Sequence, residues 1–219
     1  MCGVVGIYSP GQEAAPLATT ALFALQHRGQ ESAGVAVTDG RGVMVYKDLG
    51  LVDQVLDERR LPSLRGELAI GHCRYSTTGS TIWENSQPTL RMGPSRTVAL
   101  GHNGNLVNTR ELLEALPGGK ARLVGTTDTE LLTALLALEP ADDIVDALLR
   151  LLPRVSGAYS LVVLDEGRVI GVRDPFGFRP LVLGVLPTPD GQAWCLASET
   201  AALDVLGAEF VRDVEPVVE

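Results

Sequence analysis

The hydrophobic pattern of the chain predicts many short strands that follow one another in hairpin-like runs. Apolar or alternating stretches bounded by Gly, Pro, Asp or Ser are typical of strands. Such stretches occur at residues 4–8, 35–38, 43–46, 68–75, 97–101, 159–165, 168–172, 181–185 and 193–197. The alternation in residues 68–75 would place Ile70, His72 and Arg74 on one side of a strand. We therefore expect this strand to carry charge on one face.

Apolar residues recur at helical spacing in blocks between these runs of strands. Helices are predicted over residues 16–26, 51–61 and 144–152, from Asn108 and from Thr127 onward, and from Ser198 to Gly207. Two of these helices begin with the capping-box pattern, an Asn or Thr followed three residues later by Glu. Gly29 follows the first helix at a position typical of a left-handed C-cap. Because helices and strands come in separate blocks, the pattern favours an α+β fold of antiparallel sheets covered by helices.

Length and charge limit the class of protein. The 219 residues are enough for one domain that buries roughly 70 % of its unfolded surface, so we expect a single domain over residues 1–219. Eighteen basic and 27 acidic residues give a formal net charge of −9, and the basic residues form no run. Binding to nucleic acid or to an anionic membrane surface is therefore not expected.

The apolar segments and the cysteines indicate the compartment. No basic and apolar leader precedes residue 4, and no apolar run approaches the ~18 residues that span a bilayer. Cys2, Cys73 and Cys195 are odd in number and far apart, which argues against a disulfide framework and a Cys-rich zinc site. The three histidines show no metal-binding spacing. We expect a soluble, cytoplasmic protein with no metal or cofactor in this domain.

Cys2 is the candidate nucleophile. If Met1 is removed, Cys2 carries a thiol with a pKa of ~8.5 and an α-amine with a pKa of ~8 on one residue. The amine can then take the thiol proton, directly or through water, and leave a thiolate that attacks an amide carbonyl. The alternative is that Cys2 is a small apolar residue at the start of a buried strand.

Hydrolysis of an amide through a thioester also requires donors for the oxyanion. Asn103 and Gly104 follow a predicted strand, and in a tight polar turn the Asn103 amide and the Gly104 N–H would point at one oxygen. An Asn-Gly pair is also the commonest hairpin turn signal, so a purely structural turn is the alternative.

Arg74 and Asp128 are candidates for holding the substrate. The Arg74 guanidinium can pair with a carboxylate through two hydrogen bonds, or lie on the surface. Asp128 opens a predicted helix, where capping alone also explains a carboxylate. If both face Cys2, they bracket a zwitterion whose side-chain amide reaches the thiol. Glutamine has this pattern of groups.

Five motifs occur in order along nearly the whole chain. They are CGVVG at residues 2–6, QHRGQESAG at 26–34, GHCRYST at 71–77, GHNGNL at 101–106 and TDTE at 127–130. Together they resemble the motifs of class II glutamine amidotransferases, which are N-terminal-nucleophile hydrolases. The resemblance implies an αββα sandwich of antiparallel sheets and hydrolysis of glutamine.

The resemblance also implies a role for each matched residue. The implied set is Cys2 as nucleophile, Asn103 and Gly104 as oxyanion hole, Arg74, Thr77 and Asp128 as glutamine-binding residues, and Arg28 and Tyr75 as their support. Residues 76–80 would belong to a loop that closes over glutamine.

Within this class, three stretches are most similar to the amidophosphoribosyltransferases, which catalyse the first committed step of purine synthesis. These stretches are residues 26–34, WENSQP at 83–88 and RDPFGFRPL at 173–181. Phe178 replaces a smaller aliphatic residue that is usual in the family, which we interpret as a packing difference. The family continues into a phosphoribosyltransferase domain, and we find no such domain in residues 1–219.

The expected activity is therefore hydrolysis of L-glutamine to glutamate and ammonia. The ammonia would pass to phosphoribosyl pyrophosphate on a phosphoribosyltransferase domain or subunit, in a homo-oligomer. Two other readings remain open. One is a free-standing amidohydrolase or glutaminase subunit that acts on another amide or feeds another synthase, and the other is a glutamine-binding module without catalysis.

Overall fold

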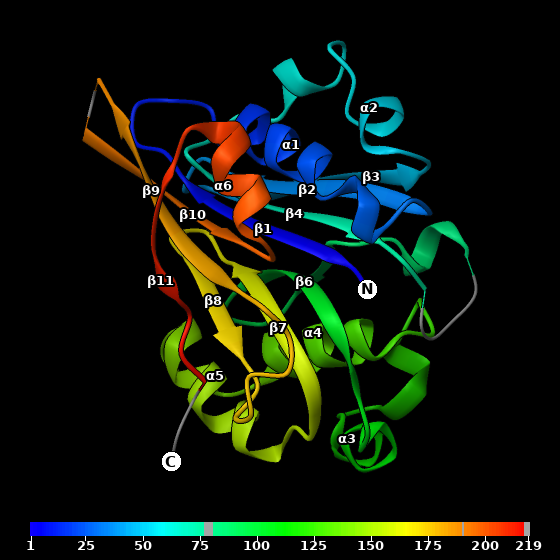
Figure 1. Cartoon of the computed structure of the whole chain (residues 1–219). Coiled ribbons are helices and arrows are strands. Elements are labelled where there is room, and N and C mark those ends of the chain that lie inside the picture. Colours follow the sequence, from blue (N-terminus) through cyan, green and yellow to red (C-terminus); the bar gives the residue numbers. More distant parts are fainter. Residues whose placement is uncertain (77–80, 190, 217–219) are drawn as a thin grey trace.

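Two sheets face each other at the centre of the molecule, as seen in the computed structural model (Figure 1). The structure describes residues 1–76, 81–189 and 191–216. A seven-stranded sheet has the order β11-β9-β10-β1-β4-β2-β3, and a four-stranded sheet has the order β5-β6-β7-β8. Every strand pair among these residues is antiparallel.

The strands of both sheets are short. The larger sheet contains β1 (Gly3–Tyr8), β2 (Ser32–Thr38), β3 (Val43–Leu49), β4 (Leu68–Arg74), β9 (Val182–Thr188), β10 (Gly191–Ala197) and β11 (Glu209–Asp213). The smaller sheet contains β5 (Thr89–Met92), β6 (Thr97–Leu106), β7 (Gly157–Leu164) and β8 (Val169–Arg173).

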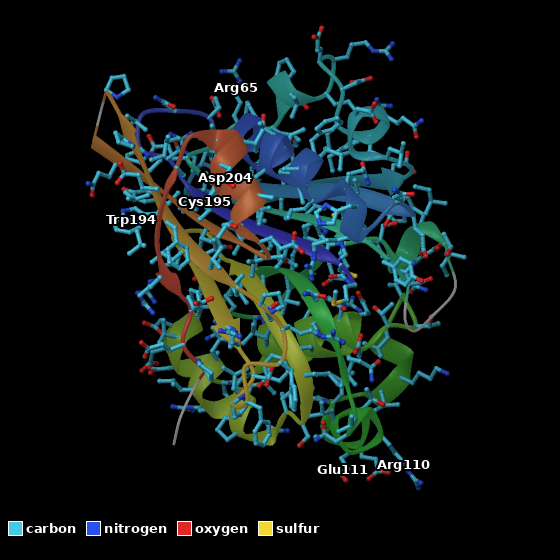
Figure 2. All side chains as sticks on the ribbon, viewed as in Figure 1. Arg65, Arg110, Glu111, Trp194, Cys195 and Asp204 are labelled. Atoms are coloured by element: carbon cyan, nitrogen blue, oxygen red, sulfur yellow. The ribbon has the colours of Figure 1, made fainter. Side chains whose placement is uncertain are left out.

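Helices cover the outer face of each sheet (Figure 1). Helices α1 (Ala14–Ala24), α2 (Val52–Val55) and α6 (Thr200–Leu206) pack on the larger sheet, and α3 (Thr109–Ala115), α4 (Asp128–Leu138) and α5 (Ile144–Leu151) pack on the smaller one. Arg110 and Glu111 point from α3 into solvent at one end of the molecule (Figure 2). In the described part of the chain, no helix combines the length and apolarity needed to cross a bilayer.

The apolar residues form three clusters that correspond to these layers. On β1, Val5 and Ile7 pack with α1, whereas Val4 points into the space between the sheets. There it meets Ile70 of β4 and Val162 of β7. Strand β1 is thus buried on both faces, which explains its nearly continuous apolar sequence. The predicted αββα sandwich of antiparallel sheets is confirmed.

Two strands carry no pattern that predicts them. Strand β5 has only four residues, and every residue of the edge strand β11 is exposed, so neither shows the alternation of a half-buried strand. Strand β6 is also longer than predicted and continues to Leu106. The predicted helix at residues 51–61 is reduced to α2 and a separate 3₁₀ turn, Leu61–Ser63.

The predicted helix caps were partly right. The Thr127 hydroxyl accepts a hydrogen bond from the Glu130 N–H, and Gly207 ends α6 in the left-handed region with a φ of 70°. The prediction for Asn108 was wrong, because its side-chain oxygen accepts from the Ser156 N–H instead of capping α3. Ser198 does not cap α6 either, since its hydroxyl accepts from the Val4 N–H.

The left-handed cap expected at Gly29 was also wrong. Gly29 is extended, with a φ of −165°. A Cβ at this position would lie 2.6 Å from the Cys73 carbonyl oxygen on β4. The glycine is required by this close approach of two backbones, which a single sequence does not reveal.

Asp174 organises the turn between β8 and β9. It is fully buried, and its carboxylate accepts hydrogen bonds from the N–H groups of Tyr159, Phe176 and Phe178. The Phe178 ring is 66 % exposed and lies 5.6 Å from the ring of Phe176, so its larger size takes no space in the core. The turn therefore depends on the buried carboxylate and not on the aromatic residues.

We predict that Asp174→Ala lowers the free energy of unfolding by about 2–3 kcal/mol. Three backbone donors would lose a charged acceptor in a site without solvent. Urea unfolding measures this change. Asp204→Ala on the exposed face of α6 is the control and is expected to change stability by less than about 0.5 kcal/mol. Equal stability of Asp174→Ala and the parent protein would contradict the prediction.

Candidate functional site

Cys2 lies at the start of the central strand β1, beside the end of β4. The ladder pairs Gly3 with Cys73, so Cys2 is next to Arg74 and Tyr75. The Cys2 thiol donates to the Tyr75 carbonyl oxygen at 3.4 Å, and the Tyr75 N–H donates to Sγ at 3.5 Å. Cys2 is only 9 % exposed, whereas Met1 is 54 % exposed.

The surroundings of Cys2 leave its thiol protonated. Burial is the largest influence, and it raises the pKa of the Cys2 thiol. The hydrogen bond to the Tyr75 backbone and the positive charges of the N-terminal amine, Arg74 and Arg28 lower this pKa, but by less than burial raises it. A thiol with a raised pKa requires a base before it can attack a carbonyl. The arginines nevertheless provide positive charge that favours the thiolate once it forms.

Cys73 and Cys195 are less suited to attack. Both are free and buried, and Cys195 lies on β10 near α6 (Figure 2). Burial raises the pKa of each thiol to about 12. Neither thiol has an α-amine beside it, so Cys2 is the best placed of the three.

Arg28 contacts the backbone of Cys2 directly. It ends the 3₁₀ turn Gln26–Arg28, its side chain is 3 % exposed, and its Nε donates to the Cys2 carbonyl oxygen at 2.8 Å. Its Nη1 forms an ion pair with Glu199. Arg28 thus links the backbone of Cys2 to Glu199.

Arg74 is buried, which rules out the alternative of an ordinary surface arginine. Its side chain is 3 % exposed, and its Nη1 lies 3.2 Å from the Glu31 carboxylate. Glu31 also accepts hydrogen bonds from Ser76 and Thr81. Partial burial acts to raise the pKa of Glu31, but the bonds from Ser76 and Thr81 and the Arg74 charge lower it overall.

Sequence reasoning did not assign a role to Glu31 or Glu199. Glu31 lies inside the motif at residues 26–34, so the resemblance provided a signal for it. Glu199 lies outside the five motifs, and only the fold brings it to Arg28.

Asn103 and Gly104 lie within β6 and not in the turn that the Asn-Gly pair suggested. They pair with Ser160 and Tyr159 of β7. The Asn103 Nδ2 is buried and has no hydrogen-bond partner among the described residues. A Cβ at Gly104 would lie 2.1 Å from the Ala158 carbonyl oxygen, so only glycine fits there. A strand thus holds an amide donor whose partner is missing.

Asp128 is held rigidly at the start of α4. Its side chain is 10 % exposed, and its carboxylate accepts from the N–H groups of Leu106 and Thr129 at 3.0 and 2.9 Å. The Nδ1 atom of His102 lies 3.7 Å from the same carboxylate. Burial acts to raise the pKa of Asp128, but His102 and the two backbone donors lower it overall. Asp128 is therefore ionised at neutral pH.

The described contacts form two groups of candidate residues, one on each sheet. The first contains Cys2, Arg28, Arg74 and Tyr75, and the second contains Asn103, Gly104 and Asp128. His72 links them, because its Nε2 donates to the His102 carbonyl oxygen at 3.1 Å. Burial lowers the pKa of His72 to about 3, so this ring is neutral.

Two of the predicted site residues remain. Tyr75 is 55 % exposed, and Thr77 lies outside the described residues.

Gln87 is a further residue of the site that sequence reasoning did not single out. Its Oε1 accepts from the His102 N–H at 2.8 Å, and its Nε2 donates to the Thr129 hydroxyl at 3.0 Å. One buried amide thus ties β6 to the first turn of α4, where Asp128 lies. Gln87 belongs to the family-like stretch at residues 83–88.

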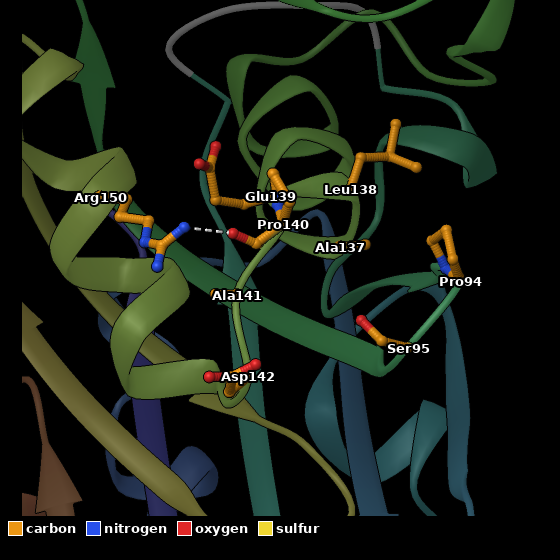
Figure 3. A pocket seen from close by; sticks show the side chains of 9 residues that line it. All are labelled: Pro94, Ser95, Ala137, Leu138, Glu139, Pro140, Ala141, Asp142 and Arg150. Carbon is orange, nitrogen blue, oxygen red and sulfur yellow. Dashed lines mark hydrogen bonds between the residues drawn. The ribbon is translucent and has the colours of Figure 1, made fainter.

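Two cavities lie at opposite ends of α4. A cavity of about 560 Å³ is lined by Asn105 and Asp128 at the start of the helix. Another of about 470 Å³ lies at its end, near Glu139 and Arg150 (Figure 3). An eleven-residue helix is about 16 Å long, so the second cavity is far from Asp128. The first cavity has the volume of a small-molecule site, and its lining includes Asp128 but not Cys2, Arg74 or Asn103.

No cluster that could hold a metal ion occurs in the part of the chain that the structure describes. The groups gathered on the two sheets are instead a thiol, two buried guanidinium groups, a carboxylate and an amide donor. These groups can hold a charged amide substrate and stabilise an oxyanion.

A family model described as a glutamine amidotransferase domain matches residues 72–205. The chain belongs to the glutamine amidotransferase domain family. This finding confirms the family that the motifs suggested. The match spans β4 to α6 and includes the residues of the second group and Arg74.

Named relatives extend the comparison over nearly the whole chain. The chain is 53% identical over 222 residues to amidophosphoribosyltransferase of Mycobacterium leprae, covering 98% of this chain and 39% of the relative. It is 49% identical over 220 residues to amidophosphoribosyltransferase of Synechococcus elongatus, covering 98% of this chain and 44% of that one. The chain thus spans less than half the length of these relatives.

A solved structure has the same fold as this chain. Glutamine phosphoribosylpyrophosphate amidotransferase from B. subtilis superimposes with a TM-score of 0.87 at 38% sequence identity, over 98% of this chain and 46% of that chain. The similarity to the amidophosphoribosyltransferases that the sequence suggested is confirmed.

We predict that Asp128→Asn destabilises the protein at neutral pH but not in acid. The folded-state pKa of Asp128 lies below its unfolded value of about 3.9. The ionised carboxylate therefore adds stability above pH 4, and this contribution is lost as the pH falls through the folded-state pKa. Urea unfolding should give a difference of about 1–2 kcal/mol at pH 7 that shrinks below pH 4.

Asp204→Asn is the control for this series, because Asp204 is exposed on α6. Its effect should be small at every pH. A difference between Asp128→Asn and the parent protein that stays constant from pH 7 to pH 3, or grows in acid, would contradict the assignment of Asp128 as an ionised group.

Proposed function

We propose that the chain is a glutaminase that uses Cys2 as an N-terminal nucleophile. The observation that carries the proposal is the position of the Cys2 thiol. It is fixed at the start of the central strand, close to the charges of Arg28 and Arg74, and burial raises its pKa. Such a thiol needs a base, and removal of the exposed Met1 would create one on the same residue.

The chemistry begins when the Cys2 α-amine takes the thiol proton. Sγ attacks the side-chain carbonyl carbon of glutamine, and the carbonyl oxygen becomes an oxyanion. The Asn103 Nδ2 and the Gly104 N–H are the proposed donors to this oxyanion, and the unpartnered Nδ2 supports that role. The amide nitrogen of the intermediate takes the proton back from the amine and leaves as ammonia, so that a thioester remains. Water then hydrolyses the thioester to glutamate and restores the thiol.

Two charged residues are proposed to hold the zwitterionic end of glutamine. Arg74 would bind the α-carboxylate, in exchange for part of its pairing with Glu31. Asp128 is ionised, so its carboxylate suits the α-ammonium group. Thr77 is proposed as a third contact on the strength of the motif alone. Arg28 and Tyr75 would support the thiol from the backbone side.

The relatives suggest where the ammonia goes. They are named amidophosphoribosyltransferases and are more than twice as long as this chain. We propose that the ammonia passes to phosphoribosyl pyrophosphate on a phosphoribosyltransferase domain or subunit, as the first step of purine synthesis. Residues 1–219 would act as a single glutaminase domain within a homo-oligomer.

The proposal predicts that Cys2→Ala abolishes ammonia release from glutamine. The rate should fall at least ~10³-fold, because no other group can form the thioester. A coupled glutamate dehydrogenase assay measures the ammonia. Cys195→Ala is the matched control, since Cys195 is a buried thiol on the neighbouring strand β10. It should keep parental kcat and KM.

A second comparison tests the amine. Protein that retains Met1 should be as inactive as Cys2→Ala although its thiol is intact. Intact mass spectrometry establishes which form is present. Activity of the Met1-retaining protein equal to that of the processed protein would show that the base is another group.

A further inference from the structure

The junction between β10 and α6 holds the first strand at two places. Ser198 is fully buried, its N–H donates to the Val4 carbonyl oxygen at 3.0 Å, and its hydroxyl accepts from the Val4 N–H at 3.0 Å. The next residue, Glu199, reaches Arg28, whose Nε donates to the Cys2 carbonyl oxygen. Two consecutive residues thus fix positions 4 and 2 of the chain.

Both carboxylate oxygens of Glu199 are engaged. Oε1 pairs with the Nη1 of Arg28, and Oε2 lies 2.9 Å from the Nε2 of His27. The Nδ1 of His27 lies 3.1 Å from the Ala24 carbonyl oxygen. Glu199 therefore lies between the guanidinium of Arg28 and the imidazole of His27.

We propose that Glu199 is a positioning residue that acts through Arg28 to orient Cys2 for attack; the inference rests on the proposed function.

The geometry of Cys2 explains why this contact affects the reaction. The carbonyl that Arg28 holds belongs to the same residue as the thiol and the amine, so it fixes the peptide plane from which both project. Displacement of a reacting group by 1 Å costs about 10²-fold in rate. Without Glu199, the guanidinium of Arg28 loses its carboxylate partner in a buried site and shifts toward water.

Glu199 also offsets the charge that acts on Cys2. The positive charge of Arg28 lowers the pKa of the Cys2 thiol. With glutamine in place of Glu199, this charge is no longer balanced, so the thiol and the amine lose their protons at lower pH. A residue that only stabilised the fold would not move the pH dependence of the reaction.

The test compares Glu199→Gln with Glu139→Gln in protein that lacks Met1. Glu139 is the matched control, because it pairs with Arg154 at 3.3 Å at the far end of α4 and its side chain is 15 % exposed. Three quantities are measured: kcat and KM for glutamine, the pH dependence of kcat/KM, and the pH dependence of Cys2 alkylation by iodoacetamide. Thermal unfolding is followed in parallel.

Glu199→Gln should lower kcat at least ~10-fold with KM within a factor of two, since substrate contacts remain. The acid limb of kcat/KM and the alkylation profile should both move to lower pH. Glu199→Asp keeps the charge, so it should retain the parental pH profiles with an intermediate kcat. Glu139→Gln should match the parent in every measurement.

Two outcomes would overturn the inference. One is parental kcat and parental pH profiles in Glu199→Gln. The other is a loss of activity that follows the loss of folded protein while both pH profiles stay unchanged, which would assign Glu199 a structural role only. The alkylation profile reports on Cys2 without glutamine, so it distinguishes failure of this inference from failure of the proposed glutaminase activity.

Discussion

The antiparallel pairing of β1 between β4 and β10 is the constraint on which the candidate site depends. Hydrogen bonds on both sides fix the first strand at the centre of the larger sheet, so the residue before it cannot fray as chain ends usually do. Gly3 makes the pairing possible here, since a Cβ would lie 2.6 Å from the Cys73 Sγ. The thiol of Cys2 thereby becomes part of a rigid sheet although it lies one residue from the terminus.

Charge is distributed around Cys2 in a balanced way. Arg28 and Arg74 are both buried. Arg28 pairs with Glu199 and Arg74 with Glu31, and both of these carboxylates are partly exposed. An unpaired buried guanidinium would destabilise the folded protein by several kcal/mol. These carboxylates therefore allow two positive charges to lie close to the thiol in a stable fold. In the proposed site, the ionised Asp128 and the unpartnered Asn103 amide would supply the complementary charge and the oxyanion donor from the opposite sheet.

Much of this arrangement could be predicted from sequence, and the exceptions have physical causes. Apolar patterning identified nine strands, because burial of one face gives alternating apolar residues and burial of both faces gives a continuous apolar run. It missed β5 and β11, which are a short strand and an exposed edge strand. Asn103 was assigned to a turn because Asn-Gly is a turn signal, whereas in the structure it pairs with β7 as part of a strand. Glu199 could not be found because its partner Arg28 is 171 residues away in sequence.

Peptide mapping after treatment with a glutamine analogue that carries an electrophilic diazoketone tests the central claim most directly. The claim is that Cys2 attacks with the help of its own amine. We expect one modified residue, Cys2, in protein that lacks Met1, protection by excess glutamine, and no modification when Met1 is retained. Modification at Cys73 or Cys195, or equal modification of Cys2 with and without Met1, would contradict the account.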